Sequence, residues 1–463
     1  MAPARVAVLG GGLAGMAAAL RLAESGYAVE LFEKRPALGG RASSFRPPGE
    51  SLLIDNCQHV LLGCCTNLID FFRRAGAGKQ FRYFSRYFFH DDGTLCSLSA
   101  SALPAPFHFL PSLAGMRMLS WQDRWAIARA LLAILREPRP FPDEPLAAWL
   151  DRHGQSPAAK ERFWKVILVS ALNEELERLS TRPAFQVFQD AFLRNRRGYR
   201  MGVPAVPLAE LYSAARMSGT YALALATPVA AVETNGERVA GIRTQEGSVR
   251  GADYYVSALP PDALANLLSA EQRDRWPQSR EWAAFEWSPI AGIHLWFDRP
   301  ILDQDHLTVC GRTIQWIFNK SAREASRDQR GAGQYVQIVI SAARSLLAKS
   351  REEILELALR ELRAVLPRSA QARLERGVVV KETKATFSFS PGADDRRPGT
   401  DTPFQNLFLA GDSTQTGWPA TMEGAVRSGY RAAERVSEAA GSPRQFLVPD
   451  LPSDPLARLL MRS

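Results

Sequence analysis

The sequence predicts an α/β fold in which one domain is built on a parallel sheet and a second domain is mixed α+β. A short apolar run over Arg5–Leu9 ends in three consecutive glycines. Residues 13–23 then place apolar side chains at helical spacing, and another apolar run follows over Ala28–Phe32. A strand, tight turn, helix and strand in this order are typical of a parallel βαβ unit.

Length and composition indicate a large globular protein. With 463 residues, the chain is expected to form roughly two or three domains. The composition is 46% hydrophobic and 23% charged, and no segment has the uninterrupted apolar length of a membrane span, so a transmembrane helix is not expected.

The charge balance favours an anionic partner. Lys and Arg number 57 against 48 acidic residues, which gives a net charge of +9. No long basic run or nucleic-acid module is present, so nucleic acid is not predicted as a partner, whereas an anionic membrane surface is compatible with the excess. Basic residues scattered over a solvated surface, without an anionic partner, would explain the net charge equally well.

The cysteines indicate a reducing compartment. There are five of them, an odd number with no Cys-x-x-Cys spacing, which argues against both a disulfide framework and a zinc site. We therefore expect a cytoplasmic protein without a metal site, peripheral to the inner face of the membrane if it contacts lipid.

The first βαβ unit carries a dinucleotide-binding motif. Gly10, Gly12 and Gly15 form the pattern Gly-x-Gly-x-x-Gly between the first strand and the helix. Glu33 lies 18 residues after Gly15, at the end of the second strand, where its carboxylate can accept a hydrogen bond from a ribose hydroxyl. This context predicts a Rossmann-type domain, but it does not distinguish NAD from FAD.

The remaining patterns divide the chain into discontinuous domains. Strands are predicted over 254–258, 293–297, 335–340 and 406–410, and helices over 125–135, 351–365 and 420–439. The nucleotide-binding domain is expected to comprise residues 1–90, 218–261 and 386–445. The substrate domain is expected to comprise residues 91–217 and 262–385, followed by a tail over 446–463. The helix predicted over 125–135, in an aromatic and basic stretch, is compatible with either core packing or contact with a membrane or an apolar substrate.

Two further motifs make the chain resemble a large family of FAD-binding enzymes. Leu38-Gly39-Gly40-Arg41-Ala42 resembles the second Gly-Gly-Arg motif of the family that includes amine oxidases and carotenoid desaturases. Gly411-Asp412 resembles its distal motif, and Thr421-Met422-Glu423-Gly424-Ala425 begins a helix whose dipole would face the flavin. The resemblance implies FAD as the cofactor and a GR2-like FAD-binding domain. The predicted FAD site comprises Gly10, Gly12, Leu13, Ala14, Gly15, Glu33, Lys34, Gly39, Gly40, Arg41, Gln58, His59, Val229, Gly411, Asp412, Thr421, Met422 and Ala425.

Within that family, the chain resembles the hydroxysqualene dehydroxylases most specifically. The segments that carry this resemblance are 55–63, 171–174 and 416–425. It implies reductive removal of a hydroxyl group from hydroxysqualene to give squalene, for hopanoid or related triterpenoid synthesis, with upstream enzymes of squalene synthesis as possible partners. The implied route protonates the hydroxyl, loses water to form an allylic cation and quenches it with hydride from N5 of reduced FAD. Relatives usually have Gly at the position of Cys57, a departure that affects how closely the backbone can approach the flavin.

Four residues are predicted to act in catalysis. His59 is a candidate acid that Asp55 would orient, and Glu174 is a second candidate acid if it is buried in the lipid pocket. Trp418 could stabilise cationic charge through its ring. Each also has a structural interpretation: cofactor or loop hydrogen bonding for His59 and Asp55, a helix surface for Glu174, and packing for Trp418.

Other functions remain open at the level of sequence. A carotenoid-type desaturase or isomerase would share the fold, the cofactor and an apolar substrate. A flavin amine oxidase would usually have an aromatic residue directly before Met-Glu-Gly, where this chain has Thr421. A protein that binds flavin and carries polyprenyl lipids without turnover is the alternative that is not an enzyme.

Overall fold

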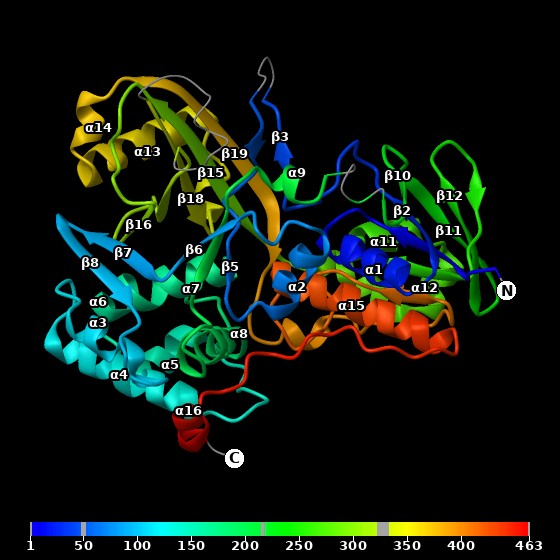
Figure 1. Cartoon of the computed structure of the whole chain (residues 1–463), viewed down its shortest axis with the longest axis horizontal. Helices are drawn as coiled ribbons and strands as arrows, with labels where there is room; N and C mark the ends of the chain where they lie inside the picture. The colour runs from blue at the N-terminus through cyan, green and yellow to red at the C-terminus, as the bar shows by residue number, and fades with distance from the viewer. Residues whose placement is uncertain (1, 48–51, 214–216, 218, 322–332, 462–463) are drawn as a thin grey trace.

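The computed structural model describes residues 2–47, 52–213, 217, 219–321 and 333–461. Its first sheet is parallel and has the strand order β10-β2-β1-β14-β20, which joins segments from both ends of the chain (Figure 1). The predicted α/β fold with a Rossmann-type domain is therefore confirmed. The strands are β1 (Arg5–Leu9), β2 (Ala28–Phe32), β10 (Ala222–Ala224), β14 (Tyr254–Ser257) and β20 (Leu407–Leu409).

Two helices at opposite ends of the sequence pack together beside this sheet. They are α1 (Leu13–Glu24) and α15 (Met422–Ala439), and Gly429 of α15 lies against the backbone carbonyl of Ala14 so closely that a Cβ would collide with it. A third helix, α2 (Thr66–Arg74), contacts α15. This close packing brings the beginnings of α1 and α15 to the same region of the molecule.

The nucleotide-binding part also carries small accessory elements. A three-stranded antiparallel sheet lies between β10 and β14 in the sequence. The accessory elements are β11 (Val229–Asn235), β12 (Arg238–Thr244), β13 (Val249–Arg250), α11 (Pro261–Leu267), α12 (Ala270–Arg275), η4 (Pro277–Ala284), β3 (Ser44–Phe45) and β4 (Ile54–Asp55).

The second part of the molecule is built on a seven-stranded mixed sheet of order β19-β15-β18-β17-β16-β7-β8. One of its faces packs on α13 (Arg351–Val365), as alternate residues of β15 and β18 show by their burial in one core cluster. The strands are β7 (Arg86–Asp91), β8 (Thr94–Ser99), β15 (Trp287–Phe297), β16 (His306–Val309), β17 (Trp316–Asn319), β18 (Gln334–Ser341) and β19 (Leu374–Phe387).

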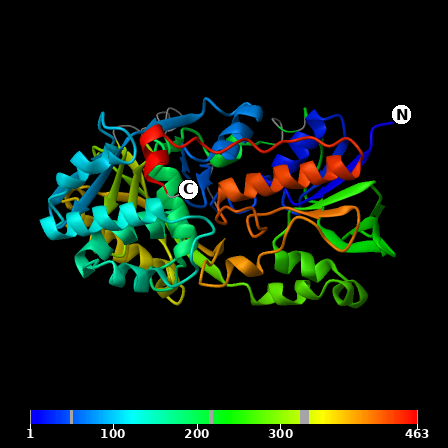
Figure 2. The same cartoon turned by 90° about the horizontal axis from the view of Figure 1, so that it is seen from below.

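A group of helices and a small sheet complete this part (Figures 1 and 2). Its longest helix, α4 (Trp121–Arg136), begins with a capping box between Ser120 and Asp123. The other elements are η1 (Phe107–Phe109), α3 (Leu110–Ala114), α5 (Leu146–Arg152), α6 (Pro157–Ala159), η2 (Lys160–Trp164), α7 (Lys165–Leu172), α8 (Thr181–Val187), η3 (Phe188–Leu193), β5 (Leu61–Leu62), β6 (Phe81–Phe84), β9 (Met201–Pro204), η6 (Arg344–Leu346), α14 (Arg368–Gln371), η7 (Asp394–Arg396) and α16 (Pro455–Leu460). Helix α9 (Leu208–Leu211) instead packs in the core of the nucleotide-binding part.

The predicted secondary structure is confirmed at the positions named above. The helix expected over 351–365 has these bounds, and the one expected over 125–135 is longer because the capping box starts it at Trp121. The expected domain boundaries stay predictions, and the one at residue 218 lies outside the described residues. Helices α11 and α12 pack on β11 of the nucleotide-binding part, although 262–385 was expected to belong to the substrate domain. No helix in the described ranges combines the length and apolarity that crossing a bilayer requires.

Two buried histidines give the fold a pH dependence. His306 lies on β16 among aromatic rings that include Tyr87 and Trp316, and His108 is fully buried beside Phe109. Burial lowers the pKa of each imidazole to about 4. Because the unfolded chain binds these protons more tightly, the stability that the neutral rings provide is complete above about pH 6.5 and is lost as the pH falls towards 4.

We therefore expect the free energy of unfolding to fall by up to about 1.4 kcal/mol per pH unit for each histidine in this window. Denaturant titrations at pH 7, 6 and 5 measure the slope. In the His306→Phe variant, the change in the free energy of unfolding per pH unit should be smaller by the contribution of one histidine. The phenylalanine ring keeps the packing but does not titrate. An unchanged slope in that variant would contradict the assignment of His306.

Candidate functional site

A large cavity of about 750 Å³ lies where the two parts of the molecule meet. Its walls include the glycine motifs at the beginnings of α1 and α15, and also side chains of α7, η3, β17 and β18. All of the predicted FAD-binding residues line this cavity except Gly15. Gly15 packs against the carbonyl oxygen of Gly10, where a Cβ would collide, which is the close packing expected at the third glycine of the motif.

The first glycine loop leaves space where a phosphate group could lie. Gly10 has a left-handed backbone with φ of 104°, and nothing lies within 4 Å of the position that a Cβ on Gly12 would occupy. Gly12 caps α1, and no side chain hydrogen-bonds the N-terminus of that helix. The free N–H groups of the first turn are therefore available to an anion.

The second glycine motif is held directly against the first. The Gly39 N–H donates to the carbonyl of Gly11 at 2.8 Å, and a Cβ on Gly40 would lie 3.2 Å from the Gly12 Cα. Both Gly39 and Gly40 have positive φ, with values of 115° and 58°. The two motifs thus form one continuous backbone cradle, and residues larger than glycine would fill it.

Glu33 and Arg41 are held in place by other groups of the chain. Glu33 accepts hydrogen bonds from the N–H groups of Gly11 at 2.7 Å and Arg35 at 2.8 Å, so its carboxylate is fixed at the cavity wall. Arg41 forms an ion pair with Asp412, which links the second glycine motif to the distal motif. Asp412 follows Gly411, whose N–H donates to Ser428 of α15 at 2.8 Å.

The predicted catalytic residues separate into two groups. His59 and Trp418 line the cavity, whereas Asp55 and Glu174 do not. Asp55 is buried behind the wall, where it accepts hydrogen bonds from Ser44 and from the Leu208 N–H, both at 2.8 Å. Asp55 is also 3.3 Å from the buried ammonium group of Lys320.

Glu174 is engaged in ion pairs away from the cavity. Both of its carboxylate oxygens accept hydrogen bonds from Arg344, at 2.5 and 2.8 Å, and Arg178 lies 3.5 Å away. Its carboxylate also accepts a hydrogen bond from Ser388. The preceding residue, Asn173, does line the cavity, and its side chain connects α7 to β15 and β19. This arrangement is that of a structural anchor, which the sequence did not distinguish from an acid in a lipid pocket.

His59 is a titratable side chain on the wall of the cavity. Its Nδ1 lies 3.1 Å from the carbonyl oxygen of Cys57, so Nδ1 carries the hydrogen and donates to that oxygen. Burial lowers the pKa of His59, which favours the neutral ring. Within the described part of the chain, no hydrogen bond is recorded to Nε2, and this nitrogen can exchange a proton with a molecule in the cavity.

Lys320, which the sequence analysis did not select, supports this wall. The Lys320 ammonium lies 2.6 Å from the Gln58 side-chain oxygen, and the Gln58 amide donates to the His59 carbonyl at 2.8 Å. Lys320 is 265 residues from Asp55 in sequence, and no local pattern indicates the pairing. Only the packing of β17 beside segment 54–59 reveals it.

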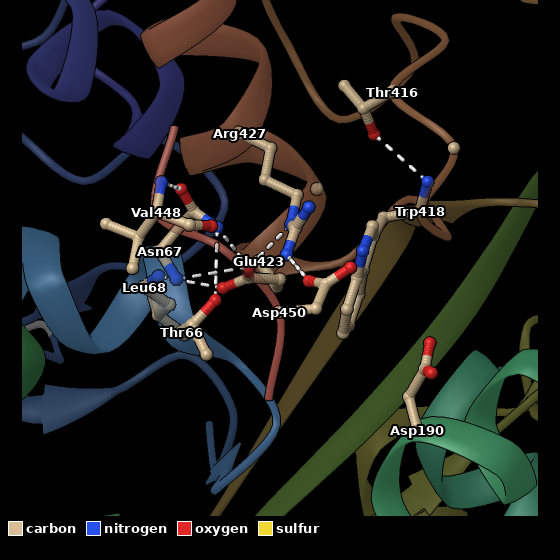
Figure 3. Close-up of polar contacts among 12 residues, drawn as sticks. Thr66, Asn67, Leu68, Asp190, Thr416, Trp418, Glu423, Arg427, Val448 and Asp450 are labelled. Atoms are coloured by element: carbon tan, nitrogen blue, oxygen red, sulfur yellow. Dashed lines mark hydrogen bonds and ion pairs between the residues drawn. The ribbon is translucent and has the colours of Figure 1, made fainter. Parts of the chain in front are cut away.

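Glu423 is the centre of a second buried network (Figure 3). It accepts hydrogen bonds from the Leu68 N–H at 2.7 Å and from Arg427 at 2.7 Å, at the beginnings of α2 and α15. Burial raises the pKa of Glu423, and Arg427 opposes that shift. The Arg427 guanidinium also stacks on the Trp418 ring, with 4.4 Å between its carbon and the ring centroid. One face of Trp418 is therefore occupied by a cation of the protein itself.

The wall opposite the glycine motifs is mostly apolar. Strand β17 directs Trp316 and Phe318 into the cavity by its two-residue alternation, and helices α7 and η3 add aliphatic and aromatic side chains. The apolar lining on this side includes Val166, Ile167, Phe192, Trp316, Phe318 and Val339. Two π-helical segments, η2 and η3, lie in this region, and such segments frequently occur at functional sites.

Comparison with known proteins identifies the family. The model of the family described as flavin containing amine oxidoreductase matches residues 13–437, which is most of the chain. The chain belongs to the flavin containing amine oxidoreductases. The cofactor is accordingly FAD, as the sequence predicted, and the protein is an FAD-dependent oxidoreductase. The cradle of Gly12 and Gly40, the fixed Glu33 carboxylate and the free first turn of α1 are compatible with its diphosphate and ribose groups.

The chain is also similar to curated enzymes that are named for phytoene and for hydroxysqualene. The chain is 26% identical to the 15-cis-phytoene desaturase of Synechococcus elongatus, over 93% of this chain and 95% of that protein. It is 27% identical to the hydroxysqualene dehydroxylase of Sinorhizobium fredii, over 93% and 98%. A solved oxidoreductase from Methanosarcina mazei has the same fold, with a TM-score of 0.73, 20% identity, and coverage of 93% of this chain and 100% of that one.

The first glycine loop provides a direct test of cofactor binding. Replacing Gly12 with valine should lower FAD affinity by about tenfold or more, because the side chain enters the space next to the free N–H groups of α1. FAD content and flavin fluorescence titration measure the change. Gly399→Val is the matched control, since its Cβ position is also open but it does not line the cavity. Equal FAD content in both variants would contradict this site.

Proposed function

We propose that this FAD-dependent oxidoreductase removes the hydroxyl group of hydroxysqualene to give squalene. The observation that carries the proposal is the apolar wall of α7, η3 and β17, which continues from the glycine motifs in one cavity. An uncharged polyprenyl chain gains free energy by burial against such a wall. Three segments resemble hydroxysqualene dehydroxylases, and each contributes residues to the lining of this cavity: 55–63, 171–174 and 416–425.

The residues of the cavity can perform the protein's share of this reaction. FAD, when bound in reduced form, supplies a hydride for the carbon that loses the hydroxyl group. His59 can hold a proton on Nε2 and donate it to the departing hydroxyl oxygen. The apolar side chains exclude water, which would otherwise capture an allylic cation. Lys320 and Gln58 hold the His59 segment in position.

Trp418 is less suited to stabilising a cationic substrate than an isolated tryptophan ring would be. Because the Arg427 guanidinium already covers one face, only the other face could meet cationic charge in a substrate. A cation on the opposite face reduces the attraction that the ring can offer. We propose that Trp418 mainly shapes the cavity, and that the Trp418–Arg427 stack fixes the beginning of α15.

A carotenoid-type desaturation is the second candidate. It is supported by the phytoene desaturase of Synechococcus elongatus, which is as similar to this chain as the hydroxysqualene dehydroxylase is. The two reactions run in opposite redox directions on similar hydrocarbon skeletons. Amine oxidation receives less support, because Thr421 occupies the place directly before Met-Glu-Gly and the wall opposite the glycine motifs is largely apolar.

The two candidates are distinguished by the direction of electron flow. Under anaerobic conditions, protein with reduced FAD mixed with hydroxysqualene should return to the oxidised flavin spectrum while squalene appears in equal amount. Oxidised protein mixed with phytoene should then show no bleaching. Bleaching with phytoene would favour the desaturase. The absence of change with either substrate would contradict enzymatic turnover of these lipids and favour a lipid-carrying flavoprotein.

A further inference from the structure

Helix α4 presents aromatic and basic side chains along one exposed stripe. Trp121, Trp125, Arg129, Leu132 and Arg136 follow one another at spacings of four, four, three and four residues, which places them on the same side of the helix. Trp121 and Trp125 are 69% and 61% exposed, although tryptophan is usually well buried. Arg129 and Arg136 are also exposed, and Leu132 is half-buried.

The opposite side of α4 is anchored in the protein and explains why the helix keeps this orientation. Asp123, the only acidic residue of the helix, is buried there with Ile127, Ala130 and Ile134. The stripe itself is therefore without negative charge. A solvated helix face usually mixes both signs of charge and has no adjacent exposed tryptophans.

Behind α4 lies the wall of the cavity. The Gln189 side chain of η3 donates hydrogen bonds to the carbonyls of Ile134 at 2.8 Å and Glu137 at 2.9 Å, at the end of α4. The neighbouring residues of η3, Asp190, Ala191 and Phe192, line the cavity. Segment η3 thus both contacts α4 and contributes to the wall of the proposed lipid site.

The C-terminal segment extends the same surface. Helix α16 contacts α4 (Figures 1 and 2). It carries Leu459, which is 79% exposed, next to the exposed Arg458. The segment is fixed to the end of η3, because the Arg194 guanidinium donates to Ser453 at 2.9 Å and the Arg194 backbone carbonyl accepts from the Asp454 N–H at 2.8 Å. Arg194 also pairs with Asp190 at 3.1 Å.

We propose that the outer face of α4, together with α16, docks on the surface of an anionic lipid bilayer. Tryptophan is enriched where a membrane meets water, because its ring is apolar and its N–H still reaches polar groups. The arginines complement anionic headgroups, and the net charge of +9 has the same sign. The reason for docking rests on the proposed function, since a polyprenyl substrate resides in the membrane, but the surface itself is defined by the exposed residues alone.

Vesicle flotation of the FAD-loaded full chain tests the proposal. Wild-type protein should float with vesicles of phosphatidylcholine and phosphatidylglycerol, and much less with phosphatidylcholine alone. The Trp121→Ala/Trp125→Ala variant should bind the anionic vesicles about tenfold or more weakly. The Arg129→Gln/Arg136→Gln variant should lose most of the preference for phosphatidylglycerol, and added salt should do the same to wild type.

Leu347→Ala/Val249→Ala is the matched control, because these exposed apolar side chains lie outside α3, α4 and α16. It should float like wild type, and every variant should keep its FAD spectrum and melting temperature. Failure of wild type to float, or equal flotation of the tryptophan variant, would overturn the proposal. Failure of wild type to float is also the outcome expected if this face binds a protein instead of lipid. Flotation without turnover of any lipid would support the membrane-docking surface and contradict the proposed function. Turnover without flotation would support the proposed function and contradict the membrane-docking surface.

Discussion

Replacing His59 with alanine is expected to lower kcat with hydroxysqualene by about 10²–10⁴-fold while the purified protein remains yellow. The imidazole lines the cavity, and its Nδ1 donates to the Cys57 carbonyl, so Nε2 is the atom that can carry the transferable proton. Removing the ring leaves the glycine cradle intact, and FAD binding should change little. Anaerobic stopped-flow measurement of flavin reoxidation gives the rate of the single turnover.

The pH profile separates this role from a structural one. Burial lowers the pKa of His59, so at pH 7 most molecules hold a neutral ring, and the protonated fraction rises as the pH falls below 6.5. The turnover rate of wild type should therefore increase towards acid pH, within the range in which the buried histidines still permit folding. The residual rate of His59→Ala should lack that rise. A variant that keeps near-normal turnover, or the same acid limb, would show that His59 is not the acid.

Replacing Glu174 with alanine is expected to destabilise the protein by about 3 kcal/mol rather than to abolish the chemical step. The carboxylate is fully buried, and its removal leaves Arg344 and Arg178 without their shared partner and Ser388 without its acceptor. Denaturant titration of the FAD-loaded protein measures the loss. Flavin reoxidation at a temperature well below the unfolding transition should remain within a few-fold of wild type.

Glu174→Gln is the informative companion variant. It keeps the size and two hydrogen-bonding positions but removes the charge, so it should recover part of the lost stability. A proton-donating role would give another result: Glu174→Gln would fold normally and yet turn over no hydroxysqualene. That outcome would indicate that Glu174 is a catalytic acid and would contradict the structural role inferred from its ion pairs.

Part of the site was predictable because its signals are local. Gly10 and Gly39 are recognised from sequence because glycine readily adopts their positive φ, and Gly12 because it leaves the cradle open. Glu33 is found by its place at the end of a strand. The lengths of α1 and α13 follow from apolar spacing and, for α13, from its capping box.

The functions of the polar residues around the cavity were less predictable. Asp55 and Glu174 lie in motifs as suggestive as that of His59, yet their side chains are held by Lys320 and Arg344, which are distant in the chain. Glu423 was visible only as part of a motif. Its ion pair with Arg427 is local to α15, but its contact with the Leu68 N–H depends on how α15 and α2 meet. Asp190 and the aromatic pair of β17 had no sequence signal beyond ordinary polar and strand patterns.

The sequence alone determined the nucleotide-binding fold, its position at both ends of the chain and, through resemblance, the class of cofactor. These properties depend on backbone conformation and short-range periodicity, which neighbouring residues dictate. Only the tertiary structure decided which ionisable groups face the cavity and which are neutralised behind its wall. That choice depends on burial and on partners brought together across hundreds of residues, because the charge state and direction of a side chain are set by its surroundings and not by its own motif.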